Sequence, residues 1–133
     1  MQMITIQAEV IFQALADETR LRIIRLMRMT SEESCLCELV DSLLEPPYKL
    51  SRHLKILRQA GLLLSQKEGR WVYHRLVTEP AYLELLYATV QALPDANEIY
   101  NKDLKRFRQR LCLREGGRCR IGIQSEMFKT EAG

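Results

Sequence analysis

The fold is decided by residues 46–76, which read PPYKLSRHLKILRQAGLLLSQKEGRWVYHRL. Pro46 or Pro47 can open a helix, because proline is well tolerated at the first helical position. Gly61 can take the left-handed conformation that ends a helix. Between them a stripe of leucines at helical spacing predicts one buried face, made of Leu50, Leu54 and Leu57. We therefore expect a helix here whose other face is polar and exposed.

A short β-hairpin is expected directly after this helix. The segment Trp71-Val72-Tyr73 is rich in β-formers, and a polar stretch ending in Glu68-Gly69 precedes it. Such a pattern predicts a turn at Glu68-Gly69 with Lys67 and Arg70 at its tip. A basic hairpin that follows an exposed basic helix is typical of a DNA-binding wing.

Three helices are expected before this stretch, over residues 7–16, 18–29 and 35–44. Asp17 is the expected N-cap of the second helix, and Thr30 or Ser34 that of the third. The third helix must end near Glu45, because a residue that precedes proline is disfavoured in helical geometry. Two short helices joined by a tight turn, the second basic, describe a helix–turn–helix.

The remainder of the chain predicts how the protein assembles. Residues 80–93 form a helix that is apolar almost all round, which we expect to pair with its symmetry mate in a homodimer; burial within one subunit is the alternative. A more polar helix over residues 95–113 and a loop or mobile tail over 114–133 follow. The expected fold is mostly α with a small β-hairpin, a winged helix–turn–helix. Residues 1–94 form its DNA-binding and dimerisation domain, and residues 95–133 a C-terminal helix and tail.

Charge points to a polyanionic partner. The chain has 133 residues, enough for one domain, and a net charge of +3. Residues 46–76 hold seven basic side chains against the single acid Glu68, so a net +6 is concentrated there. A solvated face of mixed composition is the bland alternative. No apolar run is long enough for a bilayer, and residues 1–9 show no signal peptide. We expect a cytoplasmic protein without membrane contact.

The predicted partner is double-stranded operator DNA. Ser51 and Arg52 are the best matches for base edges, because arginine pairs with guanine and hydroxyls serve several bases. His53 either contacts a phosphate or is a surface or packing histidine, and both interpretations stay open. In the wing, Lys67 and Arg70 reach the backbone or minor groove. The helix side chains expected at DNA are Tyr48, Lys49, Ser51, Arg52, His53 and Lys55.

Three segments of this sequence resemble the ArsR-type metalloregulatory repressors. The first segment is Ala14-Leu15-Ala16-Asp17-Glu18-Thr19-Arg20-Leu21-Arg22-Ile23. The second resembles the family's recognition helix and the residues that end it, and consists of Leu50-Ser51-Arg52-His53-Leu54 and Leu57-Arg58-Gln59-Ala60-Gly61-Leu62. The third resembles its wing and is Gly69-Arg70-Trp71-Val72-Tyr73-His74-Arg75-Leu76. The similarity runs from about Val10 to Leu93. It implies a homodimeric repressor that leaves its operator when it binds a toxic metal or metalloid.

The cysteines are the expected sensor. Cys35 and Cys37 stand at the start of the third helix, where, if Ser34 is the N-cap, free amides and the helix dipole favour thiolates. Soft metals bind thiolates. Residues two apart on an ideal helix point to nearly opposite sides, so we expect this turn to unwind when both sulfurs hold one ion. The alternative is a pair of small buried hydrophobic side chains.

The Cys-x-Cys element resembles that of the branch that senses trivalent arsenic and antimony. That branch often has a third cysteine three positions later, where this chain has Val40. The resemblance thus implies As(III) or Sb(III) as inducer and a third sulfur from Cys112 or Cys119. Cys112 is preferred, because it lies on the more ordered side of Gly116-Gly117.

Other interpretations remain open. Four converging thiolates, Cys35, Cys37, Cys112 and Cys119, suit Cd(II), Pb(II) or Zn(II) better than arsenite. Cys112 and Cys119 can instead form a redox disulfide, or be incidental. An enzyme is disfavoured, because both histidines fall in the DNA-binding stretch and no phosphate loop or nucleophile motif is present. A protein-interaction module has no need of so basic a helix and wing.

Overall fold

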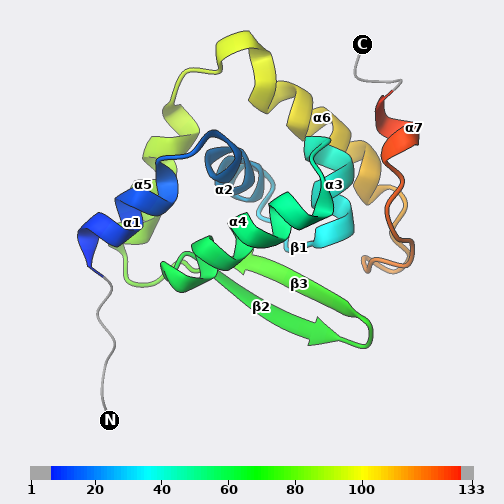
Figure 1. Cartoon of the computed structure of the whole chain (residues 1–133), viewed down its shortest axis with the longest axis horizontal. Coiled ribbons are helices and arrows are strands. Elements are labelled where there is room, and N and C mark those ends of the chain that lie inside the picture. Colours follow the sequence, from blue (N-terminus) through cyan, green and yellow to red (C-terminus); the bar gives the residue numbers. More distant parts are fainter. Residues whose placement is uncertain (1–6, 130–133) are drawn as a thin grey trace.

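The computed structural model describes residues 7–129 of the chain (Figure 1). The signal-peptide prediction rests on residues 1–9, of which 1–6 lie outside the described residues. Within 7–129, no helix has the length and apolar character needed to cross a bilayer. The elements in chain order are α1 (Ala8–Leu15), α2 (Glu18–Thr30), β1 (Ser34–Cys35), α3 (Leu36–Leu43), α4 (Pro47–Gln59), β2 (Leu63–Glu68), β3 (Trp71–Leu76), α5 (Tyr82–Ala92), the 3-10 turn η1 (Ala96–Glu98), α6 (Ile99–Leu111) and α7 (Ser125–Lys129).

The predicted boundaries of α2 and α4 are confirmed where a capping residue, a proline or a glycine sets them. Asp17 is the N-cap of α2, and its side chain accepts a hydrogen bond from the Arg20 amide at 3.0 Å. Pro47 is the first residue of α4, and Gly61 has the positive φ of 78° that lets the chain turn away after this helix. The leucine stripe of α4 is fully buried in the core against α2, α3 and β2.

The third helix begins differently from the prediction. Cys35, not Ser34, is the N-cap of α3, and Ser34–Cys35 form the short strand β1. The Glu38 carboxylate accepts a hydrogen bond from the Cys35 amide at 3.0 Å, which satisfies one of the free amides at the helix start. This correction changes the directions of the two sulfurs, as described below.

The hairpin belongs to a three-stranded antiparallel sheet in the order β1-β3-β2. Glu68 pairs with Trp71, so the turn residues are Gly69 and Arg70, one position later than predicted. Gly69 has a φ of 60°, which suits a tight hairpin turn. The unpredicted strand β1 places Cys35 opposite Tyr73 of the wing. The structure is thus mostly helical with one small sheet, and the start of α3 is tied directly to the wing.

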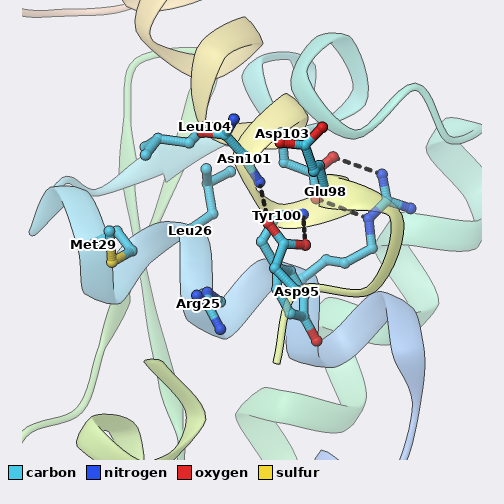
Figure 2. A pocket seen from close by; sticks show the side chains of 10 residues that line it. Arg25, Leu26, Met29, Asp95, Glu98, Tyr100, Asn101, Asp103 and Leu104 are labelled. Atoms are coloured by element: carbon cyan, nitrogen blue, oxygen red, sulfur yellow. Dashed lines mark hydrogen bonds and ion pairs between the residues drawn. The ribbon is translucent and has the colours of Figure 1, made fainter. Parts of the chain in front are cut away.

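Helix α6 docks on α2 and α3 through buried charge. Arg22 of α2 donates to both carboxylate oxygens of Asp103, at 2.9 and 2.8 Å, and both residues are at least nine-tenths buried (Figure 2). Asp95 accepts hydrogen bonds from the amides of Tyr100 and Asn101 and so caps the start of α6. The cavity of about 370 Å³ in Figure 2 is lined in part by the ion-paired Arg22 and Asp103 and by the capping Asp95.

Residues 114–124 form the loop that was one of the two expectations, but this loop packs against the helices, and the short helix α7 that follows it was not predicted. Residues 114–129 run beside α3 and end in α7 (Figure 1). Cys119 is completely buried and Phe128 is 2% exposed. The apolar and charged anchors of this segment, described in the next section, explain why glycines at 116 and 117 do not make it a free tail.

Candidate functional site

The exposed face of α4 carries most of the predicted DNA contacts. Tyr48 is 76% exposed, and Ser51, Arg52 and Lys55 are exposed beside it. They alternate with the buried leucines because the helix turns every 3.6 residues. Lys49 is half-buried and forms an ion pair with Glu45 at 3.0 Å. A row of polar and basic groups thus faces outward from the second helix of the helix–turn–helix.

His53 departs from the predicted set. It is 5% exposed, and its Nδ1 lies 3.0 Å from a guanidinium nitrogen of Arg20. Burial, with the charges of Arg20, Arg52 and Lys49 as smaller contributions, lowers its pKa. The ring is packed inside and held by Arg20, which favours the packing interpretation, while a contact of His53 with a phosphate stays a prediction.

The wing presents its basic groups at the tip. Lys67 and Arg70 are exposed, and the Arg70 guanidinium lies over the Trp71 ring at 4.7 Å from its centre. Tyr73 is 2% exposed and anchors the hairpin. The wing therefore has a buried aromatic residue at its base and exposed cationic side chains at its tip.

Three sulfurs gather behind the wing. Cys35 in β1 and Cys37 in the first turn of α3 interact through their side chains, and the Sγ of Cys119 lies 3.4 Å from that of Cys37. All three residues are buried. Because Cys35 has extended backbone and only Cys37 is helical, the two sulfurs lie on the same side without unwinding the helix. The predicted unwinding is therefore unnecessary for bringing the sulfurs together.

The thiols have unequal acidity. Hydrogen bonds with Cys35 and then Cys119, together with the charge of Arg110, lower the pKa of Cys37 to about 6 against the opposing effect of burial. The hydrogen bond with Cys37 and burial raise the pKa of Cys35. Burial first, and the hydrogen bond with Cys37 second, raise the pKa of Cys119. These contacts favour ionisation of Cys37 over that of its two neighbours, and thiolates are the form that binds soft metals.

Buried ion pairs hold the Cys119 segment in place. Arg110 of α6 donates to Asp41 of α3 at 2.6 Å, and both side chains are completely buried. The same guanidinium donates to the carbonyls of Ile121 and Gly122 at 2.8 and 3.0 Å. Asp41 also accepts from the Gln124 amide. One arginine and one aspartate therefore tie the chain beyond Cys119 to α3.

A second set of contacts lies on the other side of Cys119. Arg114 donates to both carboxylate oxygens of Glu38, at 2.7 and 2.8 Å. Arg118 pairs with Glu33 at 2.6 Å and with Glu68 at the wing end, and its guanidinium lies 3.8 Å from the centre of the Tyr73 ring. The Cys119 amide donates to the Tyr73 hydroxyl at 2.8 Å. The segment thus contacts α3 and the wing together.

The donor set fits a thiophilic ion. Cys35, Cys119 and the carboxylate of Glu38 have ligand atoms within 4.8 Å of one another, and Cys37 contacts Cys119. The Glu38 carboxylate already accepts hydrogen bonds from Arg114 and from the Cys35 amide, so the sulfurs are more available than Glu38 as metal ligands. Cys112 is exposed, and its thiol donates to the Arg108 carbonyl at 3.4 Å. The structure thus brings Cys119 to the pair, and not the preferred Cys112, and it does not assemble the four predicted thiolates.

Sequence reasoning missed the arginines that build this corner. Basic residues recur every fourth position at 106, 110, 114 and 118, the first two on α6 and the last two in the irregular chain that follows it. Helix α3 carries Glu38 and Asp41 at three-residue spacing, both completely buried. Matching these two patterns would have predicted that the segment after α6 packs on α3.

Together, the helix–turn–helix, the basic wing and the thiols behind it define a winged helix–turn–helix regulator that binds DNA. The chain belongs to the ArsR family: residues 17–65 match the model described as "Bacterial regulatory protein, arsR family". It is similar to the arsenic resistance transcriptional regulator ArsR2 of Pseudomonas putida, with 38% identity over 109 residues, which cover 77% of this chain and 94% of that protein. It is a transcriptional regulator of this family and not an enzyme.

Further relatives agree with this assignment. The arsenical resistance operon repressor of Escherichia coli K12 is 48% identical over 66 residues, which cover 50% of this chain and 56% of that protein. Among solved structures, HlyU from Vibrio cholerae N16961 has a TM-score of 0.54 and 33% identity, covering 62% of this chain and 89% of that chain. An ArsR family transcriptional regulator has a TM-score of 0.50 and 25% identity, covering 76% and 97%.

Proposed function

We propose that this protein is a metalloid-responsive repressor. It binds operator DNA as a homodimer in the cytoplasm and leaves when As(III) or Sb(III) binds Cys35, Cys37 and Cys119. The observation that carries this proposal is the 3.4 Å contact between Cys37 and Cys119, which are 82 residues apart in sequence. It supplies the third sulfur that trivalent arsenic takes. In binding, As(OH)₃ exchanges its three hydroxides for three sulfurs, and the thiol protons leave as water.

The division of the chain follows from this proposal. Residues 1–94 carry the DNA-reading helix, the wing and the dimer contact, and residues 95–133 supply the third thiolate. Apolar side chains left exposed on α1 and α5 support dimerisation by these helices, namely Val10, Phe12, Tyr82 and Leu85. In the dimer, two α4 helices about one turn of DNA apart read a roughly palindromic operator.

The sensor is coupled to the DNA-binding face through β1. Cys35 pairs with Tyr73 of β3, so a shift of the Cys35 sulfur is transmitted to the wing along the sheet. Cys37 sits in α3, the helix that packs on the reading helix α4. Drawing three sulfurs onto one arsenic therefore favours a second arrangement of wing and reading helix. The coupling free energy in allosteric systems is typically ~1–3 kcal/mol.

Two other inducers have specific support. The carboxylate of Glu38 near Cys35 and Cys119 offers an oxygen beside the sulfurs, which suits Cd(II), Pb(II) or Zn(II) with mixed donors. An oxidant is the second, because Cys37 and Cys119 are close enough to form a disulfide after a small movement. We favour arsenic, since Glu38 is already bound by Arg114 and three sulfurs remain available.

The test is fluorescence anisotropy with labelled DNA from upstream of the protein's own gene. We expect affinity to fall steeply with salt, because phosphate neutralisation drives binding. Arg52→Ala should weaken binding by roughly 1–3 kcal/mol, the worth of a good base contact, whereas Lys105→Ala on exposed α6 should not. Arsenite should release the native protein and Cys112→Ser, but not Cys35→Ser, Cys37→Ser or Cys119→Ser.

Arsenic K-edge absorption on the same variants counts the sulfur ligands directly. We expect three sulfurs around arsenic in the native protein and in Cys112→Ser, and fewer in Cys119→Ser. Absence of DNA binding at low ionic strength would overturn the repressor assignment. Normal release of Cys119→Ser by arsenite would remove Cys119 from the sensor. Release by cadmium but not by arsenite would favour the mixed sulfur and oxygen site.

A further inference from the structure

An open groove lies between the reading helix α4 and the wing. Ser51 and Arg58 of α4 and Arg70 of the wing line it, and no carboxylate is among its described lining residues. A recognition helix enters the major groove of DNA, while a wing reaches the adjacent minor groove. One strand of phosphates separates these two DNA grooves. In a complex, that strand therefore has to cross the groove between α4 and the wing.

The chain that follows Cys119 forms one wall of this groove. Gly122 and Ile123 line it, although they come after α6 in the sequence. Arg118, just before Cys119, pairs with Glu68 at the end of the wing and so holds this part of the chain there. We call residues 120–123 the groove segment. It lies beside both elements that are expected to contact DNA.

The backbone of the groove segment turns two amide groups away from the protein interior. The carbonyls of Ile121 and Gly122 both accept hydrogen bonds from the completely buried Arg110. Because N–H and C=O point in opposite directions in a trans peptide, the amides of Gly122 and Ile123 point away from Arg110. Within residues 7–129, neither amide donates a hydrogen bond to another group. Free backbone amides of this kind are common phosphate contacts in DNA-binding proteins.

The charge of the segment suits the same partner. Arg114 and Arg118 are paired with glutamates, whereas Arg120 is exposed and has no carboxylate partner in the described part of the chain. Its guanidinium donates to the carbonyl of Cys119 at 3.1 Å. Residues two apart lie at most about 7 Å from each other along the chain, so the long Arg120 side chain can reach a phosphate held by Gly122. Residues 116–125 contain no acidic residue that would oppose it.

Gly122 leaves room for another molecule to approach. A methyl group on its Cα would have no described protein atom within 4 Å, so packing does not require glycine here. Nor does backbone conformation, since Gly122 lacks the positive φ that is found at Gly116 and Gly117. A third physical reason for glycine is the close approach of a ligand to the backbone. The free amides at this position agree with that reason.

We propose that the groove segment is a third DNA-contacting element of this protein, in addition to α4 and the wing. The amides of Gly122 and Ile123 and the guanidinium of Arg120 hold a phosphate of the strand that crosses the groove. This inference rests on the proposed binding of operator DNA. The contact reads no base, and so it adds affinity for any sequence. It also places a DNA contact directly after Cys119, the proposed third ligand of the sensor.

Two substitutions of opposite charge at Gly122 test this inference on the full chain without metalloid. Both side chains extend into open space, so urea denaturation should show similar stability for Gly122→Glu and Gly122→Lys. Fluorescence anisotropy with the protein's own promoter DNA should separate them. At about 0.1 M salt we expect Gly122→Glu to weaken binding by roughly threefold or more and Gly122→Lys to strengthen it, because phosphate charge dominates this affinity.

Arg120→Gln tests the side-chain contact. It should weaken binding to the promoter and to a scrambled duplex by the same factor, and should reduce the slope of log affinity against log salt by about 1. Arg108→Gln is the matched control, since it removes the same charge from the exposed side of α6. Its salt slope should equal that of the native protein.

Neutral methylphosphonate groups, placed one at a time along the promoter DNA, locate the contact. In each half-site, one such replacement should weaken binding of the native protein but should not weaken Arg120→Gln further. If both Gly122 variants bind DNA equally and Arg120→Gln behaves like Arg108→Gln, the inference fails while the repressor assignment stands. Absence of DNA binding by the native protein at low salt would overturn both.

Discussion

The reading face and the thiol corner of this protein are built in opposite ways. The reading face is a continuous stretch, residues 46–76, whose exposed side chains each stand on a regular helix or hairpin. The thiol corner joins α3, β1 and a segment that follows α6, and its central contact links residues 82 apart. The first depends on local pattern, and the second depends on buried ion pairs. Substitutions should therefore affect the two regions very differently.

The largest expected effect lies in the thiol corner. Arg110→Met removes the partner of the completely buried Asp41 and should reduce the free energy of unfolding by about 3–5 kcal/mol, because an uncompensated charge stays in the interior. Arsenite binding should weaken as well, since Arg110 also holds the carbonyls of Ile121 and Gly122 next to Cys119. Urea denaturation measures the first effect, and calorimetry the second.

The matched control for this substitution is Arg108→Met, on the exposed side of the same helix. Its effect on stability should be within about 0.5 kcal/mol, as for ordinary surface changes. If Arg110→Met behaved like Arg108→Met, the buried ion pairs would not be what holds the corner together, and the contrast between the two regions would disappear.

This contrast also explains which features the sequence predicted. The Asp17 cap, the start of α4 at Pro47 and the turn after Gly61 each depend on neighbours within a few residues. The leucine stripe of α4 needs only the helical period. For the same reason the exposed positions of Ser51 and Arg52 followed directly from the pattern. Local rules are sufficient for the reading face.

The features that sequence reasoning missed all depend on distant partners. Strand β1 has two residues, too few for a pattern, and exists because it pairs with β3. Cys112 was preferred over Cys119 because it precedes the glycines, but the ion pairs of Arg110 and Arg114 order the chain beyond them. For His53 the sequence left two interpretations open, and its contact with Arg20 of another helix is not visible in the local pattern. None of these contacts is set by neighbours within a few residues, although the matching charge spacing around α6 and α3 is a signal for the ion pairs.

A middle-sized effect is expected at the boundary between the regions. His74 of β3 lies opposite Ser34 of β1 and is 4% exposed, and burial lowers its pKa from 6.5 to about 4. The unfolded chain therefore binds a proton between pH 6.5 and 4 that the folded protein does not. Stability should fall as the pH drops through this window, by up to about 1.4 kcal/mol per pH unit from this one group.

Urea denaturation between pH 7 and 4.5 tests this prediction with His74→Leu. The variant removes the titrating group, and so its stability should depend less on pH in this window than that of the native protein. Above pH 7, where neither the folded nor the unfolded state binds this proton, the free energy of unfolding should depend on pH equally in the variant and the native protein. An unchanged slope below pH 6.5 would show that His74 is not the group that resists protonation.

The smallest effect concerns Arg118, whose ion pairs connect the thiol corner to the end of the wing. It pairs with Glu33 beside the corner and with Glu68 at the end of the wing, and these groups are 27–46% exposed. Exposed ion pairs contribute less than about 1 kcal/mol, so Arg118→Gln should barely change stability. The substitution leaves the Glu68 carboxylate without its partner, next to the cationic Lys67 and Arg70. Because an unpaired negative charge there opposes binding to phosphates, DNA affinity should fall two- to fivefold, on the order of 0.5–1 kcal/mol.

A double-mutant cycle decides whether that contact has the assigned role. In a Glu68→Gln background the wing carries no unpaired carboxylate, and so Arg118→Gln should no longer weaken DNA binding beyond the loss of one distant positive charge. The cycle is measured by anisotropy at two salt concentrations, because an electrostatic coupling must shrink as salt rises. Additive effects of the two substitutions would mean that the ion pair of Arg118 with Glu68 does not couple the segment carrying Cys119 to the wing. Signal transmission would then have to use the other described contacts, namely β1, α3 and the hydrogen bond from the Cys119 amide to the Tyr73 hydroxyl.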